Sequence, residues 1–271
     1  MRKLREEDRQ SIMRYIEKEP EFNLFLIGDL ENFGVDSEHV NFYAEDRADE
    51  YDFLIMRYRD SFVLYSCFED YDADAAATYL LSQHAEFING KGSVLERIVS
   101  YFPELNVKRS YLSKLTSLNQ DSELPQGYEC KFLEPNDARS QVDLFLLIEE
   151  FRDSYLGRES EQIENIKVNL ESTGRAIGAY HAQALIGTAG IAASNSMSAM
   201  IIGVATHPDY RNLGIASALV ASLCRDCLDR GMKFLCLFYD NPKAGSIYRK
   251  IGFCEMGGYI LMTPNHENKD S

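Results

Sequence analysis

The stretch AMIIGVATHPDYRNLGIASAL, residues 199–219, decides how the rest of the chain is interpreted. It begins with an apolar run of strand length at residues 200–205. Pro208 then ends the strand, because proline has no N–H to give to a sheet. Residues 211–216 enter a helix, whose first N–H groups have no intrahelical partner and form its positive end. The pattern therefore predicts a strand, a short loop and a helix start suited to an anion such as a pyrophosphate.

Residues 211–216, RNLGIA, match the R/Q-x-x-G-x-G/A signature of the GNAT superfamily of N-acetyltransferases. The resemblance continues downstream, where Asn241, Tyr248 and the pair Gly252-Phe253 stand at the spacing of the family's second block. It covers about residues 127–262. An ordinary strand-to-helix turn of another α/β fold is the alternative, but it would not explain the second block. The sequence therefore resembles a GNAT acyltransferase over its C-terminal half.

The resemblance implies an α/β fold with a mixed sheet, the GNAT acyl-CoA N-acyltransferase fold. The expected order is strand, two helices, three strands, helix, strand, helix, strand. The hydrophobic patterns place strands near 128–133, 174–180, 184–193, 198–206, 233–239 and 253–262, and helices near 134–152, 160–171, 214–230 and 243–251.

Two domains are predicted. The catalytic GNAT domain spans 127–263, and a polar stretch with Pro125 forms the linker 119–126. An N-terminal α/β domain spans 1–118, and 264–271 is a polar tail. Patterns in the first domain favour helices at 4–19, 21–32, 73–84 and 91–102 and strands at 39–45, 52–59, 61–67, 86–89 and 107–117.

The N-terminal domain is either a second, degenerate GNAT-like domain or an unrelated α+β domain. Its element order favours the first alternative. It contains no R-x-x-G-x-G/A, and its candidate equivalent stretch, FEDYDADAAATYL, is acidic where a phosphate would lie. Carboxylates would repel a pyrophosphate, so we expect no cofactor in this domain.

Composition narrows the class of protein further. No apolar run approaches the roughly 18 residues of a membrane span, and no apolar segment follows the charged N-terminus as in a signal peptide. The six cysteines include a C-x-x-C at Cys224 and Cys227, but it lies on a predicted helix without a second ligand pair. We therefore expect no metal and a cytoplasmic protein with reduced cysteines.

The net charge of −15 bears on the partners. Residues 1–125 carry 14 basic and 25 acidic side chains, against 14 and 18 in residues 126–271. Nucleic acid and membrane partners are not expected, because phosphate binding needs a basic surface. A small-molecule or peptide amine acceptor of cationic character fits the charge, and a merely solvated acidic surface is the alternative. The first domain could shape the acceptor site or form a homodimer interface.

The resemblance implies acetyl-CoA as the co-substrate. Its pantetheine would pair with the end of the strand before the loop, and its pyrophosphate would bind the loop and helix start. An Asn and a Tyr of the second block would add contacts. The expected cofactor-binding residues are Val204, Ala205, Thr206, Arg211, Asn212, Leu213, Gly214, Ile215, Ala216, Asn241 and Tyr248.

The catalytic residues are harder to predict. Tyr248 is the expected proton donor to the departing thiolate, although core packing is its alternative role. The strand before the loop has no carboxylate, so Glu149, Glu150 and Asp153 are candidate bases, as are His207 and a water chain. We expect the amine to attack the thioester directly. The alternative is a non-catalytic acyl-CoA-binding or regulatory module.

Overall fold

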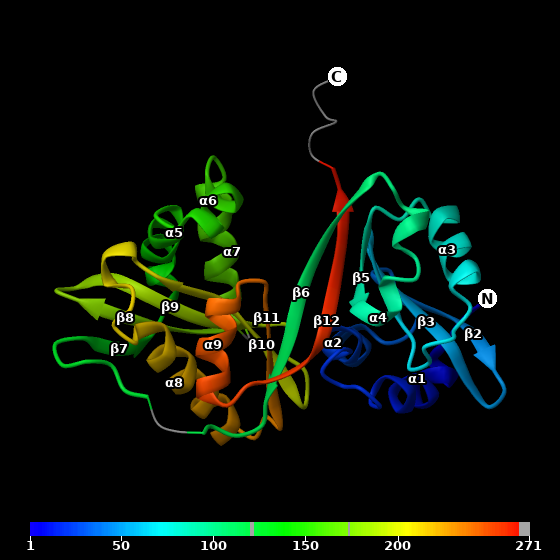
Figure 1. Cartoon of the computed structure of the whole chain (residues 1–271), viewed down its shortest axis with the longest axis horizontal. Helices are drawn as coiled ribbons and strands as arrows, with labels where there is room; N and C mark the ends of the chain where they lie inside the picture. The colour runs from blue at the N-terminus through cyan, green and yellow to red at the C-terminus, as the bar shows by residue number, and fades with distance from the viewer. Residues whose placement is uncertain (120–121, 173, 266–271) are drawn as a thin grey trace. The chain divides into compact units, whose positions relative to one another are not determined.

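A computed structural model describes residues 1–119, 122–172 and 174–265 (Figure 1). The chain divides into two compact units. Unit 1 comprises Met1–Ser113, Phe238–Asp240 and Glu255–Ser271, and unit 2 comprises Lys114–Leu237 and Asn241–Cys254. The end of the predicted catalytic domain is thus counted with unit 1, and the domain boundaries stay a prediction. Residues 120–121 of the linker and 266–271 of the tail lie outside the described residues.

The sheet of unit 2 has the strand order β11-β10-β9-β8-β7. The neighbours from β7 to β10 run antiparallel, whereas β10 and β11 run parallel. A parallel pair needs a crossover connection, and here the crossover is the helix α8. The strands are β7 (Glu129–Phe132), β8 (Arg175–His181), β9 (Ala184–Ala192), β10 (Ser198–Thr206) and β11 (Phe234–Tyr239).

Helices cover both faces of this sheet. Figure 1 shows α5, α6 and α7 on one face and α8 and α9 on the other. Helix α8 buries Ile215, Leu219 and Leu223, which repeat at helical spacing, and it gives way to Gly231 at a positive φ of 98°. The helices are α5 (Ala138–Leu146), α6 (Glu149–Tyr155), α7 (Glu159–Glu171), α8 (Ile215–Asp229) and α9 (Pro242–Ile251), with 3-10 turns η3 (Pro135–Asp137) and η4 (Pro208–Tyr210).

The single helix expected at 134–152 is wrong. The chain forms η3, then α5, and a separate α6 begins at Glu149. Ile148 adopts an extended conformation between them and buries its side chain in the cluster that contains Phe145, while Leu147 stays half exposed. Burial of Ile148 against the sheet thus outweighs the helix-forming pattern. The extended backbone at Ile148 changes the direction of the chain before α6, which begins with Glu149 and Glu150.

The sheet of unit 1 has the strand order β1-β2-β3-β4-β5-β12-β6. Its helices α1 and α2 lie on one face, and α3 and α4 on the other (Figure 1). The elements are β1 (Arg2–Lys3), β2 (Val40–Arg47), β3 (Glu50–Tyr58), β4 (Ser61–Tyr65), β5 (Phe87–Lys91), β6 (Leu105–Leu115), β12 (Cys254–Pro264), α1 (Arg9–Ile16), α2 (Leu24–Phe33), α3 (Ala73–Ser82), α4 (Gly92–Leu95), η1 (Glu6–Asp8) and η2 (Val99–Tyr101).

Two helices of unit 1 are shorter than expected. The helix predicted at 4–19 is α1 alone, because the chain begins as a strand and Leu4 is buried before η1. The helix predicted at 91–102 is only α4 followed by η2. The backbone of Gly92 packs so closely against Gly258 that a Cβ on Gly92 would lie 2.9 Å from the carbonyl of Gly258.

Within the described residues, no helix is long and apolar enough to cross a membrane.

Candidate active site

The end of β10 separates from β11. Their parallel pairing runs from Ser198↔Phe234 to Ile201↔Leu237, whereas the pairing with β9 continues to Thr206. A bulge between Ile202 and Ala205 contains Gly203 at φ 59°. Such a bulge bends the strand. Residues 204–206 therefore have β9 on one side and, within the described chain, no paired strand on the other.

The three residues predicted to meet pantetheine occupy this open end. Ala205 is buried, and Val204 and Thr206 are half-buried. The Oγ1 of Thr206 is buried and has no hydrogen-bond partner among the described residues. An extended ligand could pair with backbone N–H and C=O groups here as an added strand does. The structure thus brings these residues to one strand end, as the sequence predicted.

The loop after β10 leads into α8 through left-handed backbone. Asn212 has φ 65° and Gly214, the N-cap of α8, has φ 80°. A Cβ built on Gly214 would meet no atom within 4 Å, so the space beside it is open. Ala218 N donates to Gly214 O at 3.0 Å. The N–H groups before it belong to the first turn, which begins beside this open space at the positive end of a 15-residue helix.

Charges near the helix start are mixed. Arg211 is 47% exposed, and its Nη2 lies 3.8 Å from Oε2 of Glu150, which is 64% exposed. Glu149 and Asp153 are also exposed. His207 accepts a hydrogen bond from Asp209 N at 3.2 Å and so acts as a turn residue. The structure places the candidate base Glu150 beside the predicted phosphate ligand Arg211, a neighbourhood that the sequence did not indicate.

The second block forms the start and core of α9. Oδ1 of Asn241 accepts a hydrogen bond from Lys243 N at 2.9 Å, so Asn241 is the N-cap. Tyr248 is 9% exposed, and its ring centroid lies 5.9 Å from that of Phe253. Burial raises the pKa of the Tyr248 hydroxyl to about 12. The hydroxyl is therefore protonated at neutral pH, the state that a proton donor needs, and the same ring also packs in the core.

A cavity of about 320 Å³ opens between α5–α7 and the strands β8–β10. No sequence pattern had predicted this cavity. Phe151 and Tyr155 stand four residues apart on α6, both lining the cavity, and this spacing was the available signal. On the opposite wall lie Ile202, which is 44% exposed, and Gly203. The cavity thus reaches the bulge of β10 from the side of the redirected helix α6.

A buried polar pair joins α5 to β9, and no sequence pattern indicated it. Nε2 of Gln141 on α5 donates to Oγ1 of Thr188 on β9 at 3.1 Å. Both side chains are buried, at 6% and 0% exposure. The hydrogen bond between this amide and this hydroxyl holds α5 on the sheet.

Among the described residues, no group of three or more His, Cys, Asp or Glu side chains could hold a metal ion.

The fold defines a class of protein, an α/β unit in which one strand separates from its parallel neighbour directly before the N-terminus of a helix. Residues 144–253 match the family model described as "Acetyltransferase (GNAT) family". This match lies within the C-terminal half of the chain, where the sequence resembles the family. The comparison with curated proteins gave no match.

Solved structures resemble the whole chain. A GCN5-related N-acetyltransferase-like protein from Streptococcus suis is 20% identical with a TM-score of 0.58, covering 96% of this chain and 99% of that one. A GCN5-related N-acetyltransferase from Sphaerobacter thermophilus is 17% identical with a TM-score of 0.61, covering 96% and 93%. A tandem GNAT protein from the clavulanic acid biosynthesis pathway is 13% identical with a TM-score of 0.55, covering 97% of each chain.

These similarities concern the fold. They extend over both units, so the predicted fold class, a GNAT fold preceded by a smaller GNAT-like α/β part, is confirmed. The predicted site residues and partners stay predictions.

Proposed function

We propose that unit 2 transfers an acetyl group from acetyl-CoA to a primary amine. The observation that carries the proposal is the open, unpaired end of β10 directly before the positive end of α8. The first can pair with an extended chain, and the second can bind an anion. Acetyl-CoA has an extended pantetheine arm and a pyrophosphate, in that order from its reactive end.

The residues present fit this co-substrate. Gly214 leaves room beside the helix start, and Arg211 adds a full positive charge there. Residues 204–206 offer backbone groups to the arm. The N-cap Asn241 and the buried Tyr248 belong to α9, on the same face of the sheet as α8. No metal takes part in this proposal.

The proposed reaction is direct attack by the neutral amine on the thioester carbonyl. A new C–N bond forms, the C–S bond breaks, and the thiolate leaves. Backbone N–H groups at the end of β10 would stabilise the developing oxyanion, and Tyr248 would give a proton to the thiolate. The proton released by the amine would go to water or to a carboxylate of α6, for which Glu149 and Glu150 are the candidates.

The acceptor proposed is a small-molecule or peptide amine of cationic character. The net charge of −15 would attract such a molecule and repel nucleic acid. The cavity beside α6 is lined by aromatic side chains and reaches Gly203 of the bulge. We propose a cytoplasmic location, where the six free cysteines would stay reduced. The proposed oligomeric state is a homodimer.

A second candidate function is an acyl-CoA-binding or regulatory module without turnover. One observation favours it: no residue of β10 is a carboxylate, so the strand offers no general base. Release of free thiol from acetyl-CoA in the presence of a panel of primary amines separates the two functions. Binding without thiol release from any amine would support the module and contradict the transferase.

We expect Arg211→Ala to weaken acetyl-CoA binding about tenfold, because a charge-assisted contact to a phosphate contributes about 1.5–3 kcal/mol when protected from water and less here, where the guanidinium is half exposed. Calorimetry measures the change. Arg139→Ala is the matched control, since Arg139 pairs with Asp143 on the exposed face of α5. Equal weakening in both variants would show only a long-range charge effect.

We expect Glu150→Gln to tighten acetyl-CoA binding by up to about fivefold, because the exposed pair with Arg211 contributes at most about 1 kcal/mol and a carboxylate repels the phosphates. Calorimetry again measures it. If Glu150 is also the base, turnover falls as well. Asp153→Asn, at an exposed position of the same helix, is the control for binding. Weaker binding in Glu150→Gln would contradict this account of the pair.

A further inference from the structure

Unit 1 contains a cavity of about 560 Å³ between α2 and its sheet. Its floor is a row of side chains from four neighbouring strands. Met56 pairs with Val63, Val63 with Asn89, and Asn89 with Leu261. The volume lies within the range of about 300–1,000 Å³ that small-molecule sites occupy. The row is apolar except for its single amide.

Aromatic rings form the walls. Phe25 of α2 stacks on Phe238 with centroids 6.4 Å apart and planes 17° from parallel. Phe238 in turn lies 4.6 Å from the ring of Tyr259. Asp29 stands four residues after Phe25, so both side chains lie on the same face of α2 and both line the cavity. The cavity is therefore an aromatic box with one carboxylate on its helical side.

Three other polar side chains of the cavity, Asn89, Lys108 and Tyr259, already have partners. The hydroxyl of Tyr259 donates to Oδ1 of Asn89 at 2.7 Å, and Nδ2 of Asn89 donates to the carbonyl of Phe62 at 3.2 Å. Nζ of Lys108 lies 3.4 Å from Oδ2 of Asp240. These hydrogen bonds hold the side chains of the floor in place. Because Lys108 is paired with Asp240, its charge does not attract an anion strongly.

Asp29 differs from these groups. It makes no hydrogen bond or ion pair with any residue that the structure describes. Burial of the carboxyl raises its pKa to about 6, and no neighbouring charge contributes to this shift. At neutral pH it is therefore an ionised carboxylate that has lost part of its hydration without gaining a counter-charge. A cation bound beside it would compensate that loss.

We propose that this cavity binds a small organic cation, an ammonium group carried on an apolar body. The ammonium would pair with Asp29 and lie near the faces of Phe25 and Phe238, where cation–π attraction adds to the ion pair. The apolar body would cover the floor at Val63 and Leu261. The site belongs to unit 1 and does not depend on the acetyl transfer proposed for unit 2.

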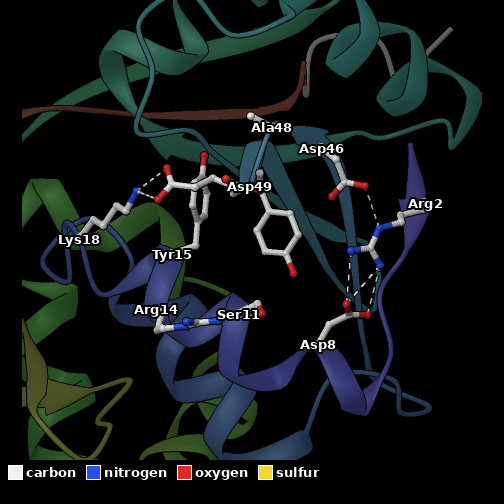
Figure 2. A pocket seen from close by; sticks show the side chains of 11 residues that line it. Arg2, Asp8, Ser11, Arg14, Tyr15, Lys18, Asp46, Ala48 and Asp49 are labelled. Atoms are coloured by element: carbon white, nitrogen blue, oxygen red, sulfur yellow. Dashed lines mark hydrogen bonds and ion pairs between the residues drawn. The ribbon is translucent and has the colours of Figure 1, made fainter.

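Another cavity of unit 1, of about 320 Å³, shows why a charge without a partner matters. Figure 2 shows Arg2 between Asp8 and Asp46, with hydrogen bonds to both. Nζ of Lys18 lies 2.6 Å from Oε1 of Glu50 in the same wall. Each of these charges already has a counter-charge, so a ligand would have to displace an existing pair.

The test is calorimetric titration of the full chain with 2-phenylethylamine in the absence of acetyl-CoA. The neutral isostere 2-phenylethanol is titrated in parallel. We expect the amine to bind and the alcohol to bind at least about tenfold more weakly, because a charge-assisted contact is lost. Asp29→Asn, which keeps the side-chain shape, should weaken amine binding by a similar factor and leave the alcohol unaffected.

Three controls make the result specific. Glu7→Gln removes an equal charge from an exposed position of η1 and should leave binding unchanged. Ser110→Phe adds bulk to a lining residue of β6 and should weaken binding of both probes. An unchanged melting temperature in Asp29→Asn would show that the variant is folded, and removal of an unpaired buried charge is not expected to destabilise it.

The pH dependence gives an independent readout. The titratable groups that line the cavity are Asp29 on α2, Tyr58 on β3, Lys108 on β6 and Tyr259 on β12. Burial raises the pKa of the Asp29 carboxyl to about 6, so amine affinity should rise as pH rises through about 6 and the carboxyl ionises. Asp29→Asn should abolish this rise. The proposal is overturned by no amine binding at millimolar concentration, equal affinity for the alcohol, or unchanged affinity in Asp29→Asn.

Discussion

The variant Tyr248→Phe is expected to turn over about 100- to 10,000-fold more slowly than the wild-type protein, the usual contribution of general acid catalysis. Its affinity for acetyl-CoA should change little, since only a hydroxyl is lost. Burial raises the pKa of Tyr248 to about 12, so the hydroxyl stays protonated between about pH 6 and 9. The ratio of wild-type to variant rates should therefore be constant over this range. Single-turnover thiol release at saturating substrate is the measurement.

The ring of Tyr248 also packs in the core, so this experiment needs a control for packing. Phenylalanine preserves the edge contact with Phe253, whose centroid lies 5.9 Å away. Tyr180→Phe is the matched control, because it removes a hydroxyl that bonds to Asp137 at 3.0 Å elsewhere in unit 2. The Tyr180→Phe variant should turn over at the wild-type rate. A fall of less than about threefold in Tyr248→Phe would assign the residue to core packing alone.

Local patterns predicted much of unit 2. The helix expected at 214–230 is α8, Ile215–Asp229, and the strand expected at 198–206 is β10 with the same bounds. Both depend on signals that neighbouring residues supply, namely an apolar run, a proline and a glycine. The juxtaposition of the strand end and the helix start follows directly, because one short loop joins them.

What the sequence could not supply depends on contacts between distant residues. VDLFLLIEEF has a helical pattern throughout, and only burial of Ile148 in a cluster of α5, β8 and β9 residues explains the break. Strand β12 pairs with β5 from Tyr259↔Lys91 to Met262↔Ile88, a register that no local pattern encodes. The position of Glu150 beside Arg211 depends on that same break.

The cavity in unit 1 has the same origin. Asp29 is the one acidic residue within the buried-looking segment FNLFLIGDL, a local conflict that could have been noticed. Its significance appears only when Phe238 and Tyr259, more than 200 residues further along the chain, complete the aromatic walls. Sequence patterns identify such a residue as unusual, whereas the fold indicates what it faces.

The variant Gly214→Asp is expected to lose at least about 100-fold in acetyl-CoA affinity, which corresponds to about 2.7 kcal/mol. Two effects add. Gly214 has φ 80°, a conformation that costs a side chain about 1–2 kcal/mol, and a carboxylate there would lie at the helix start where the phosphates are proposed to bind. A Cβ itself meets no atom within 4 Å, so steric clash within the protein contributes nothing.

Gly214→Asn separates these two effects. Asparagine has nearly the same size as aspartate and tolerates left-handed backbone, as Asn212 at φ 65° in the same loop shows. It should weaken binding by about tenfold or less, so that the further loss in Gly214→Asp measures the charge. Raising the salt concentration should reduce that further loss, because the site is open to solvent. Calorimetry that finds undiminished acetyl-CoA affinity in Gly214→Asp, in a variant that still unfolds cooperatively, would refute the assignment of this helix start as the phosphate site.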